Sequence, residues 1–445
     1  LTFVLFVSLI LALVESASVQ MAKNYRRADM NRALECVFAE YQKELLENYD
    51  VFAIECGYET GTYTEQNILD RLSYYGADME NEIERIQLFT DNSGELFRDQ
   101  VGKYMKHKYG IAWADKYLGN VSLWKNQEEK ADEFTEEEEK QNDQLKDLLG
   151  EQEAELPEEE NPMQHVAELK RSSILGLVLP KDKTISEKQI SLQEMPEKRE
   201  NHTGYGTFSD VEPEDGTLTS VLLGEYVIDH FTDFTDGPKG GELDYELEYI
   251  LEGHASDREN LETVASKLLM VRFVPDYAYI QTDPEKKAEA EAAALTLCTV
   301  IGLPELAEGA AQGILLAWAY GEAIMDIRTL ISGGKVPLVK NAEDWKLSLS
   351  GLMQLGSVGE NVAADSGKDM ESGLAYREYL RMLLFLKSQD EVGMRTLDMV
   401  EQNLKIRYGQ TFFRADACIS RVEFHSTCNL RRGIMYDFPT YFGYN

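Results

Sequence analysis

The chain has 445 residues, of which 43% are hydrophobic and 10% aromatic, so it can bury a core and is not a wholly disordered protein. Its 80 acidic and 44 basic residues give a formal net charge of −36. Because nucleic acids are bound by basic surfaces, this balance argues against a nucleic acid as partner. A chain of this length usually exceeds one compact domain, so we expect more than one structural region.

The chain begins with LTFVLFVSLILALVESASVQ, in which residues 1–14 are uncharged and Glu15 ends the apolar run. A transmembrane helix needs about 17–25 residues, so a few apolar residues upstream would complete a span. The alternative is a secretory signal with Ser16-Ala17-Ser18 as its cleavage site. We favour the anchor, because apolar side chains continue at helical spacing with no Gly or Pro between: Met30, Leu34, Val37, Phe38, Tyr41 and Leu45.

The sequence therefore predicts one continuous helix, with a transmembrane anchor at 1–20 and an amphipathic stalk at 21–50. Glu15 is a candidate assembly residue, because an ionisable side chain at the end of an apolar helix is costly unless it is paired or reaches water. Two interpretations stay open: Glu15 marks the water boundary, or it pairs with a partner's amino terminus or basic residue. Lys23, Arg26 and Arg27 favour a cytoplasmic body, whereas the large acidic body favours an external one.

The middle of the chain changes composition abruptly. Residues 51–126 form the first part of a globular head, with a strand at 49–58 and helices at 64–92 and 95–118. Between Glu128 and Glu160 there are sixteen acidic residues and three lysines. Such a run cannot bury enough apolar surface to offset chain entropy. We therefore predict an acidic mobile linker over 127–162.

Residues 163–445 form the second part of the head. We expect strand periodicity at 243–249, where Leu and Tyr alternate with acids. Ser256 and Glu259 form a capping box, and Asp283-Pro284 opens another helix. The predicted elements are a helix at 219–232, a core helix at 305–331, a short strand in GGKVPLVK and a helix at 372–406. The fold class is α+β, mainly helical, with short strands from both halves.

Five cysteines are present, and Cys418 and Cys428 bracket the segment CISRVEFHSTC. If its two halves are short strands, a hairpin would bring the two thiols together, and a disulfide would indicate an oxidising compartment. The alternative is two reduced thiols. Cys36, Cys56 and Cys298 have no metal-ligand spacing and are expected to be small apolar residues.

Catalytic motifs give no support for an enzyme. The six histidines form neither H-x-x-x-H nor HExxH, and G-x-S-x-G and GxxxxGK[ST] do not occur. With 80 acids, no carboxylate pair is diagnostic of glycoside chemistry. We therefore predict no catalytic, cofactor-binding or metal-binding residue, no cofactor and no enzymatic activity.

Several long segments carry a family resemblance. They are TFVLFVSLILALVESASVQ, ALECVFAEYQKELLENYDVFAIECGY, ELDYELEYILEGHASDRENLETVASKLLMVR and LLAWAYGEAIMDIRTLISGGKVPLVKNAEDWKLSL. They resemble a domain-of-unknown-function family of Gram-positive, clostridial-type surface proteins, whose genes tend to sit among tight-adherence (Tad) pilus genes beside small pilin-like proteins.

The resemblance implies a minor-pseudopilin-like component of a Tad or type IV-like pilus system. It implies partners among pilin and pilus-assembly proteins, reached through the N-terminal helix, and a place in the cell membrane with an extracellular domain, or in a surface pilus. The second hypothesis is a surface-anchored hydrolase that acts on cell-wall or host polymers. A deep polar cleft with converging carboxylates would favour the hydrolase, and a protruding stalk with a globular head would favour assembly.

Overall fold

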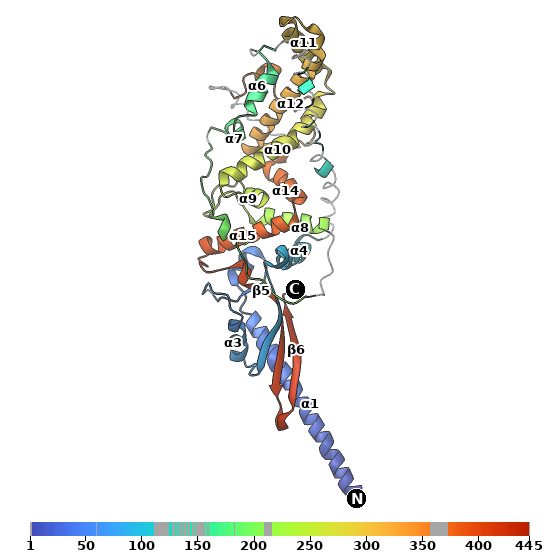
Figure 1. Ribbon diagram of the computed structural model, residues 1–445, viewed down its shortest axis with the longest axis vertical. Helices are drawn as coiled ribbons and strands as arrows, with labels where there is room; N and C mark the ends of the chain where they lie inside the picture. Colours follow the sequence, from blue (N-terminus) through green and yellow to red (C-terminus); the bar gives the residue numbers. More distant parts are fainter. Residues whose placement is uncertain are drawn as a thin grey trace.

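The structure is a computed structural model that describes residues 2–58, 60–110, 124–126, 160–181, 183–208, 216–356 and 373–444, with scattered positions between 130 and 157. The molecule is elongated, with the start of α1 at one end and α11 at the other (Figure 1). As expected, it is mainly helical with short strands. Most of the acidic segment predicted as a mobile linker lies outside the described residues, so that interpretation stays a prediction.

The described elements follow the chain in this order. The helices are α1 (Thr2–Phe38), α2 (Lys43–Tyr49), α3 (Gln66–Tyr74), α4 (Glu95–Tyr109), α6 (Pro162–Leu169), α7 (Ile174–Val178), α8 (Gly216–His230), α9 (Glu246–Glu252), α10 (Asp257–Ile280), α11 (Pro284–Val300), α12 (Ala307–Ile331), α13 (Leu349–Leu352), α14 (Tyr376–Leu386) and α15 (Gln389–Arg407). The strands are β1 (Ile54–Glu55), β2 (Glu80–Leu88), β3 (Lys335–Val336), β4 (Leu374–Ala375), β5 (Cys418–Asn429) and β6 (Met435–Gly443).

Helix α1 is one rod of 37 residues, about 55 Å long at the usual rise per residue. Only its second half carries buried side chains, at the predicted helical spacing: Met30, Ala33, Leu34, Val37 and Phe38. The expected continuation to residue 50 is wrong, because the helix ends at Phe38 and α2 begins at Lys43. The backbone N–H of Gln42 donates to the carbonyl of Ala53 at 2.8 Å, so a tertiary contact takes it out of the helical pattern.

Strand β5 is the centre of a four-stranded antiparallel sheet. It pairs with β2 along one edge and with β1 and β6 along the other. Ile54 lies opposite Ile419, so an early strand and a strand from the second half of the chain meet in one sheet. The sheet and the second half of α1 enclose the smaller hydrophobic core, to which α3 adds Ile68 and Leu72.

The helix predicted at 64–92 is confirmed in its first part and wrong in its second, because α3 ends at Tyr74 and the strand β2 follows. Ile83 and Ile86 are three residues apart, which mimics helical spacing. In the structure the register with β5 shifts between Ile83 and Arg85, so an irregularity in the strand turns both isoleucines toward the core.

The strand predicted at 243–249 is also wrong, because most of this stretch forms α9. Alternation of apolar and acidic residues normally indicates one buried face. Here the acids are buried as well: Glu246 accepts the backbone N–H of Thr232, and Glu248 accepts that of Phe234. The alternating pattern therefore does not separate a buried face from an exposed one.

The two predicted helix caps and the predicted core helix are confirmed. Ser256 caps α10 by accepting the N–H of Glu259, and Asp283 caps α11 ahead of Pro284. The predicted core helix is α12, which is largely buried and packs against α10 and α11 in the larger, helical core. The predicted helix at 372–406 is two helices, because the backbone at Lys387 is extended and separates α14 from α15.

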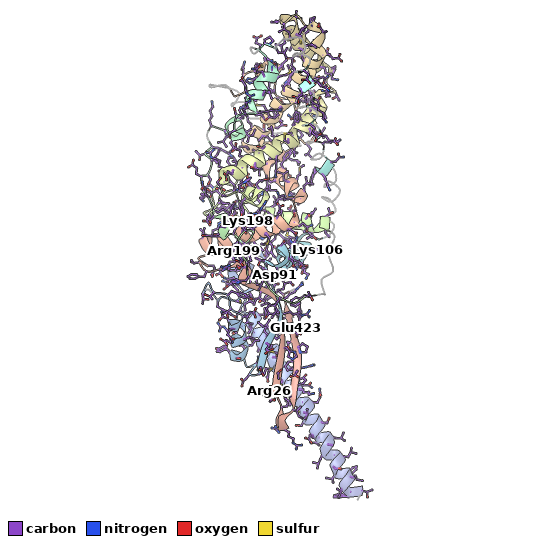
Figure 2. The ribbon with its side chains drawn as sticks, in the orientation of Figure 1. Arg26, Asp91, Lys106, Lys198, Arg199 and Glu423 are labelled. Carbon is purple, nitrogen blue, oxygen red and sulfur yellow. The ribbon has the colours of Figure 1, made fainter. Side chains whose placement is uncertain are left out.

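Arg199 joins the helical head to the sheet. Its guanidinium donates to both carboxylate oxygens of Glu401 in α15, at 2.6 and 2.8 Å, and to Asp416 just before β5. Asp416 also accepts the backbone N–H of His202 at 3.0 Å. Figure 2 shows Arg199 at the boundary between the helices and the strands. This charged network links α15 of the helical head to the segment that leads into β5.

We predict that Leu34→Ala destabilises the smaller core by about 2–4 kcal/mol, because Leu34 is 3% exposed and its removal leaves a cavity. Leu13→Ala, on the exposed half of the same helix, is the matched control and should change stability little, since Leu13 is 62% exposed. Hydrogen exchange of the β5 amides in the full chain in detergent measures both. Equal effects of the two substitutions would contradict this division of α1.

Candidate functional site

The first half of α1 is an exposed apolar surface. Its large side chains are between 37% and 77% exposed: Phe3, Val4, Leu5, Phe6, Val7, Leu9, Ile10, Leu11, Leu13 and Val14. Within the described part of the chain, α1 is the helix that is long and apolar enough to cross a membrane. An 18-residue window has a mean hydropathy of 2.2, and none of that window is buried. A contiguous apolar surface of this kind marks a site that lipid or another apolar surface covers.

Glu15, the sequence-predicted assembly residue, ends this surface and pairs with Arg432. Arg432 lies at the tip of the β5–β6 hairpin, in a short 3-10 turn over Arg431–Gly433. The two side chains are 47% and 75% exposed, so the ion pair faces solvent and contributes little stability. Sequence reasoning missed Arg432, because a partner 417 positions away leaves no local pattern.

A second set of contacts joins α1 to β6. The ammonium of Lys23 lies 4.7 Å from the ring centre of Tyr436, and the guanidinium of Arg27 lies 5.7 Å from the rings of Tyr436 and Phe438. Such cation–π contacts stabilise by roughly 0.5–1 kcal/mol each at exposed sites. Figure 2 shows Arg26 beside the same hairpin. We call Lys23, Arg26, Arg27, Arg431 and Arg432 the basic collar.

The two bracketing cysteines are not brought together. Cys418 and Cys428 lie at opposite ends of the single strand β5, so the predicted hairpin between them is wrong. The segment is one strand because β2 and β6 pair with it along its length. Both thiols are free, as are those of Cys36, Cys56 and Cys298. Burial raises the pKa of the Cys418 thiol well above its usual value, which disfavours the reactive thiolate.

The helical head contains a fully buried ionic cluster. Arg272 of α10 donates to Asp276 and to Asp326 of α12, at 3.0 Å each. The ammonium of Lys340 lies 2.8 Å from Asp326 and also contacts Glu322 and, at 3.6 Å, Asp276. Burial opposes ionisation of Asp326, yet Lys340 and Arg272 hold its pKa below the usual value.

These five side chains have no exposed surface, and none of them lines a cavity given by the described residues. The cluster therefore locks α10, α12 and the segment that carries Lys340 against one another. In this arrangement the cluster is out of reach of solvent.

We predict that Lys340→Met destabilises the head by about 3–5 kcal/mol, because it leaves Glu322, Asp276 and Asp326 buried with Arg272 as their remaining cation in the cluster. Lys267→Met is the control, since its pair with Glu252 has a lysine side chain that is 45% exposed, and should cost less than about 1 kcal/mol. Urea unfolding followed by circular dichroism measures both. A similar cost for the two variants would show that burial of the cluster is not what matters.

Two other buried acids have strongly raised pKa values. Burial, reinforced by Asp233, raises the pKa of Glu248 to about 8, and burial raises that of Asp398 to about 7. Glu248 accepts the hydroxyl of Tyr376 at 2.8 Å, and Asp398 accepts that of Tyr249 at 2.7 Å. Raised pKa values are typical of functional acids, but neither group lines a described cavity.

The raised pKa of Glu248 predicts a pH dependence of stability. Between the ordinary value near 4.5 and about 8, the unfolded chain releases a proton that the folded chain keeps, so stability falls as pH rises. The stability of the native chain relative to Glu248→Gln should therefore fall between pH 5 and 8, by up to about 1.4 kcal/mol per pH unit. Denaturant unfolding at several pH values measures this difference, and a difference that is flat or rises with pH would contradict the assignment.

A polar cavity of about 570 Å³ lies beside the sheet, between the end of β2 and residues 201–208. Asp91, labelled in Figure 2, is the lining carboxyl whose pKa burial raises. Its oxygens accept the backbone N–H groups of Leu88 at 2.7 Å and Gly204 at 3.1 Å. Glu95 accepts the side-chain amide of Asn92. Both acids therefore make hydrogen bonds that hold the local structure at the edge of this cavity.

Metal binding has no geometric support in the described residues, where no group of three or more His, Cys, Asp or Glu side chains could hold an ion. A family model described as "Family of unknown function (DUF5702)" matches residues 152–430. The match covers most of the helical head and all of β5, and it does not include α1. No curated protein and no solved structure matches the chain.

Proposed function

Because the chain belongs to the DUF5702 family, whose function is unknown, we propose a role from its geometry. The protein is a membrane-anchored, pilin-like structural or interaction component of a Tad or type IV-like pilus system on the bacterial surface. The observation that carries this proposal is the division of α1 into an exposed apolar half and a half packed on an antiparallel sheet.

The exposed apolar half of α1 is favoured in an apolar environment. Apolar side chains such as Phe3, Leu5 and Phe6 are at least 60% exposed, and their transfer from water into lipid is favourable. In lipid, helices associate by close packing and by buried polar contacts. One helix can therefore serve first as an anchor and then as the surface through which subunits pack in a filament.

The packed half fixes the head to this helix. No break separates Val14 from Met30, so the apolar rod and the buried rod are one rigid element. The head consequently stands at a fixed position on the anchor, with an extracellular domain as the orientation that fits pilus assembly. Such a layout suits a protein that presents or joins other subunits.

Glu15 is the residue that would pair with a partner subunit during assembly. Its pair with Arg432 is exposed, and exposed ion pairs are weak, so a partner's amino terminus or basic residue can replace Arg432 at low cost. The alternative, in which Glu15 only marks the water boundary, predicts that its charge is dispensable for association.

The hydrolase hypothesis has weaker support. Burial strongly raises the pKa values of Asp276, Glu248 and Asp398, but none of these three acids lines a described cavity. Asp91, which does line one, is engaged by backbone N–H groups. We therefore give assembly precedence and treat hydrolysis of cell-wall or host polymers as the alternative outcome.

The test uses Glu15→Gln in a bacterium with a Tad pilus system. The full chain should fractionate with membranes, and its deletion variant without residues 2–20 should become soluble. Glu15→Gln should still reach the membrane but should co-purify with pilus components at several-fold lower yield. Glu35→Gln, an exposed acid farther along α1, is the matched control and should co-purify normally.

Each outcome separates the alternatives. If Glu15→Gln co-purifies as well as the native chain, Glu15 is a boundary marker. If the native chain never associates with pilus components, the assembly proposal is wrong, and polymer hydrolysis by the purified chain becomes the assay of choice.

A further inference from the structure

The tip of the β5–β6 hairpin combines positive charge with exposed apolar side chains. Arg431 and Arg432 are exposed, Ile434 is 37% exposed and Met435 is 65% exposed. Cations beside exposed apolar groups are typical of surfaces that lie in the interface between lipid and water. In a chain with a net charge of −36, such a cluster is a local reversal of sign.

The tip has a defined level along α1. Arg432 pairs with Glu15, so the tip lies beside the end of the apolar run, and the contact of Lys23 with Tyr436 lies farther along the helix. Glu15 and Lys23 are about 12 Å apart along the helix axis at the usual rise per residue. The headgroup layer of a bilayer is roughly 5–8 Å thick on each side, so long basic side chains from both levels can reach it.

The conformation of the tip is specific. Arg432 has a φ of 64° and Gly433 a φ of 73°, and the N–H of Leu430 donates to the carbonyl of Ile434 at 2.8 Å. A non-glycine residue in the left-handed region carries a conformational cost, which is accepted where the surrounding structure requires it. Here that backbone projects two consecutive arginines from the end of the hairpin.

We propose that the basic collar, with Ile434 and Met435, is a binding surface for anionic phospholipid headgroups. The arginines and Lys23 contact headgroup phosphates, and the two apolar side chains enter the outer edge of the acyl region. This inference rests on the proposed membrane anchoring, and it adds a second, lipid-selective contact that sets the head upright on the bilayer.

The first experiment locates the tip. The full-length Met435→Trp variant is inserted into vesicles of phosphatidylcholine alone, or of phosphatidylcholine and phosphatidylglycerol in equal amounts, with brominated chains as quenchers. The fluorescence of the chain without the introduced tryptophan is subtracted, because the native chain has four tryptophans. Quenching of the introduced tryptophan should then be several-fold stronger in the anionic vesicles and should fall as salt is added. Val300→Trp, 73% exposed at the far end of the head, should not be quenched.

The second experiment removes the charges. Arg431→Gln with Arg432→Gln, in the Met435→Trp background, should abolish the preference for anionic vesicles while the chain still inserts. Lys239→Gln with Arg258→Gln removes two exposed cations elsewhere and should keep the preference. Quenching that ignores lipid charge, or that survives loss of both arginines, would overturn the headgroup contact but leave anchoring intact. A chain that fails to insert into either vesicle would overturn the anchoring proposal and this inference together.

Discussion

The antiparallel pairing of β5 is the interaction on which the rest of the molecule depends. One edge of β5 takes β2 and the other takes β1 and β6, so segments from the first ninety residues and the last thirty meet on one strand. The sheet that results covers the apolar side of α1 and carries the hairpin whose tip reaches Glu15. The position of the collar and the attachment of the head to α1 both follow from this pairing.

Charge is divided between the two ends of the molecule in different ways. In the head, carboxylates and cations are withdrawn into the interior, where the cluster around Lys340 fixes α10 against α12. A buried network of this kind costs desolvation and is retained where it specifies one arrangement of helices. At the end that carries the exposed half of α1, by contrast, the cations of the basic collar stay at the surface. The buried charges fix the packing of the helices, whereas the collar cations make exposed contacts with Glu15 and with the aromatic rings of β6.

Prediction from the sequence worked where a single periodicity dominated. The apolar run, the buried spacing from Met30 to Phe38, the cap at Ser256 and the core helix α12 were all visible locally. It failed where tertiary contacts decided the outcome. The N–H of Gln42 donates to the carbonyl of Ala53 and so ends the helical pattern. A register shift in β2 turns Ile83 and Ile86 toward the same core. Glu248 is buried and accepts the hydroxyl of Tyr376. Arg432 could not be found, since only the completed sheet brings it to Glu15.

The central place of β5 in the sheet also determines when the smaller core can form during synthesis. The apolar side of α1 is synthesised first, but the strands that cover it come from residues 418–443, near the end of the described chain. At typical rates of synthesis of about 5–20 residues per second, the strands that pack on the apolar side of α1 are made on the order of 20–80 s after it. During this interval Met30, Leu34 and Phe38 are open to other apolar surfaces.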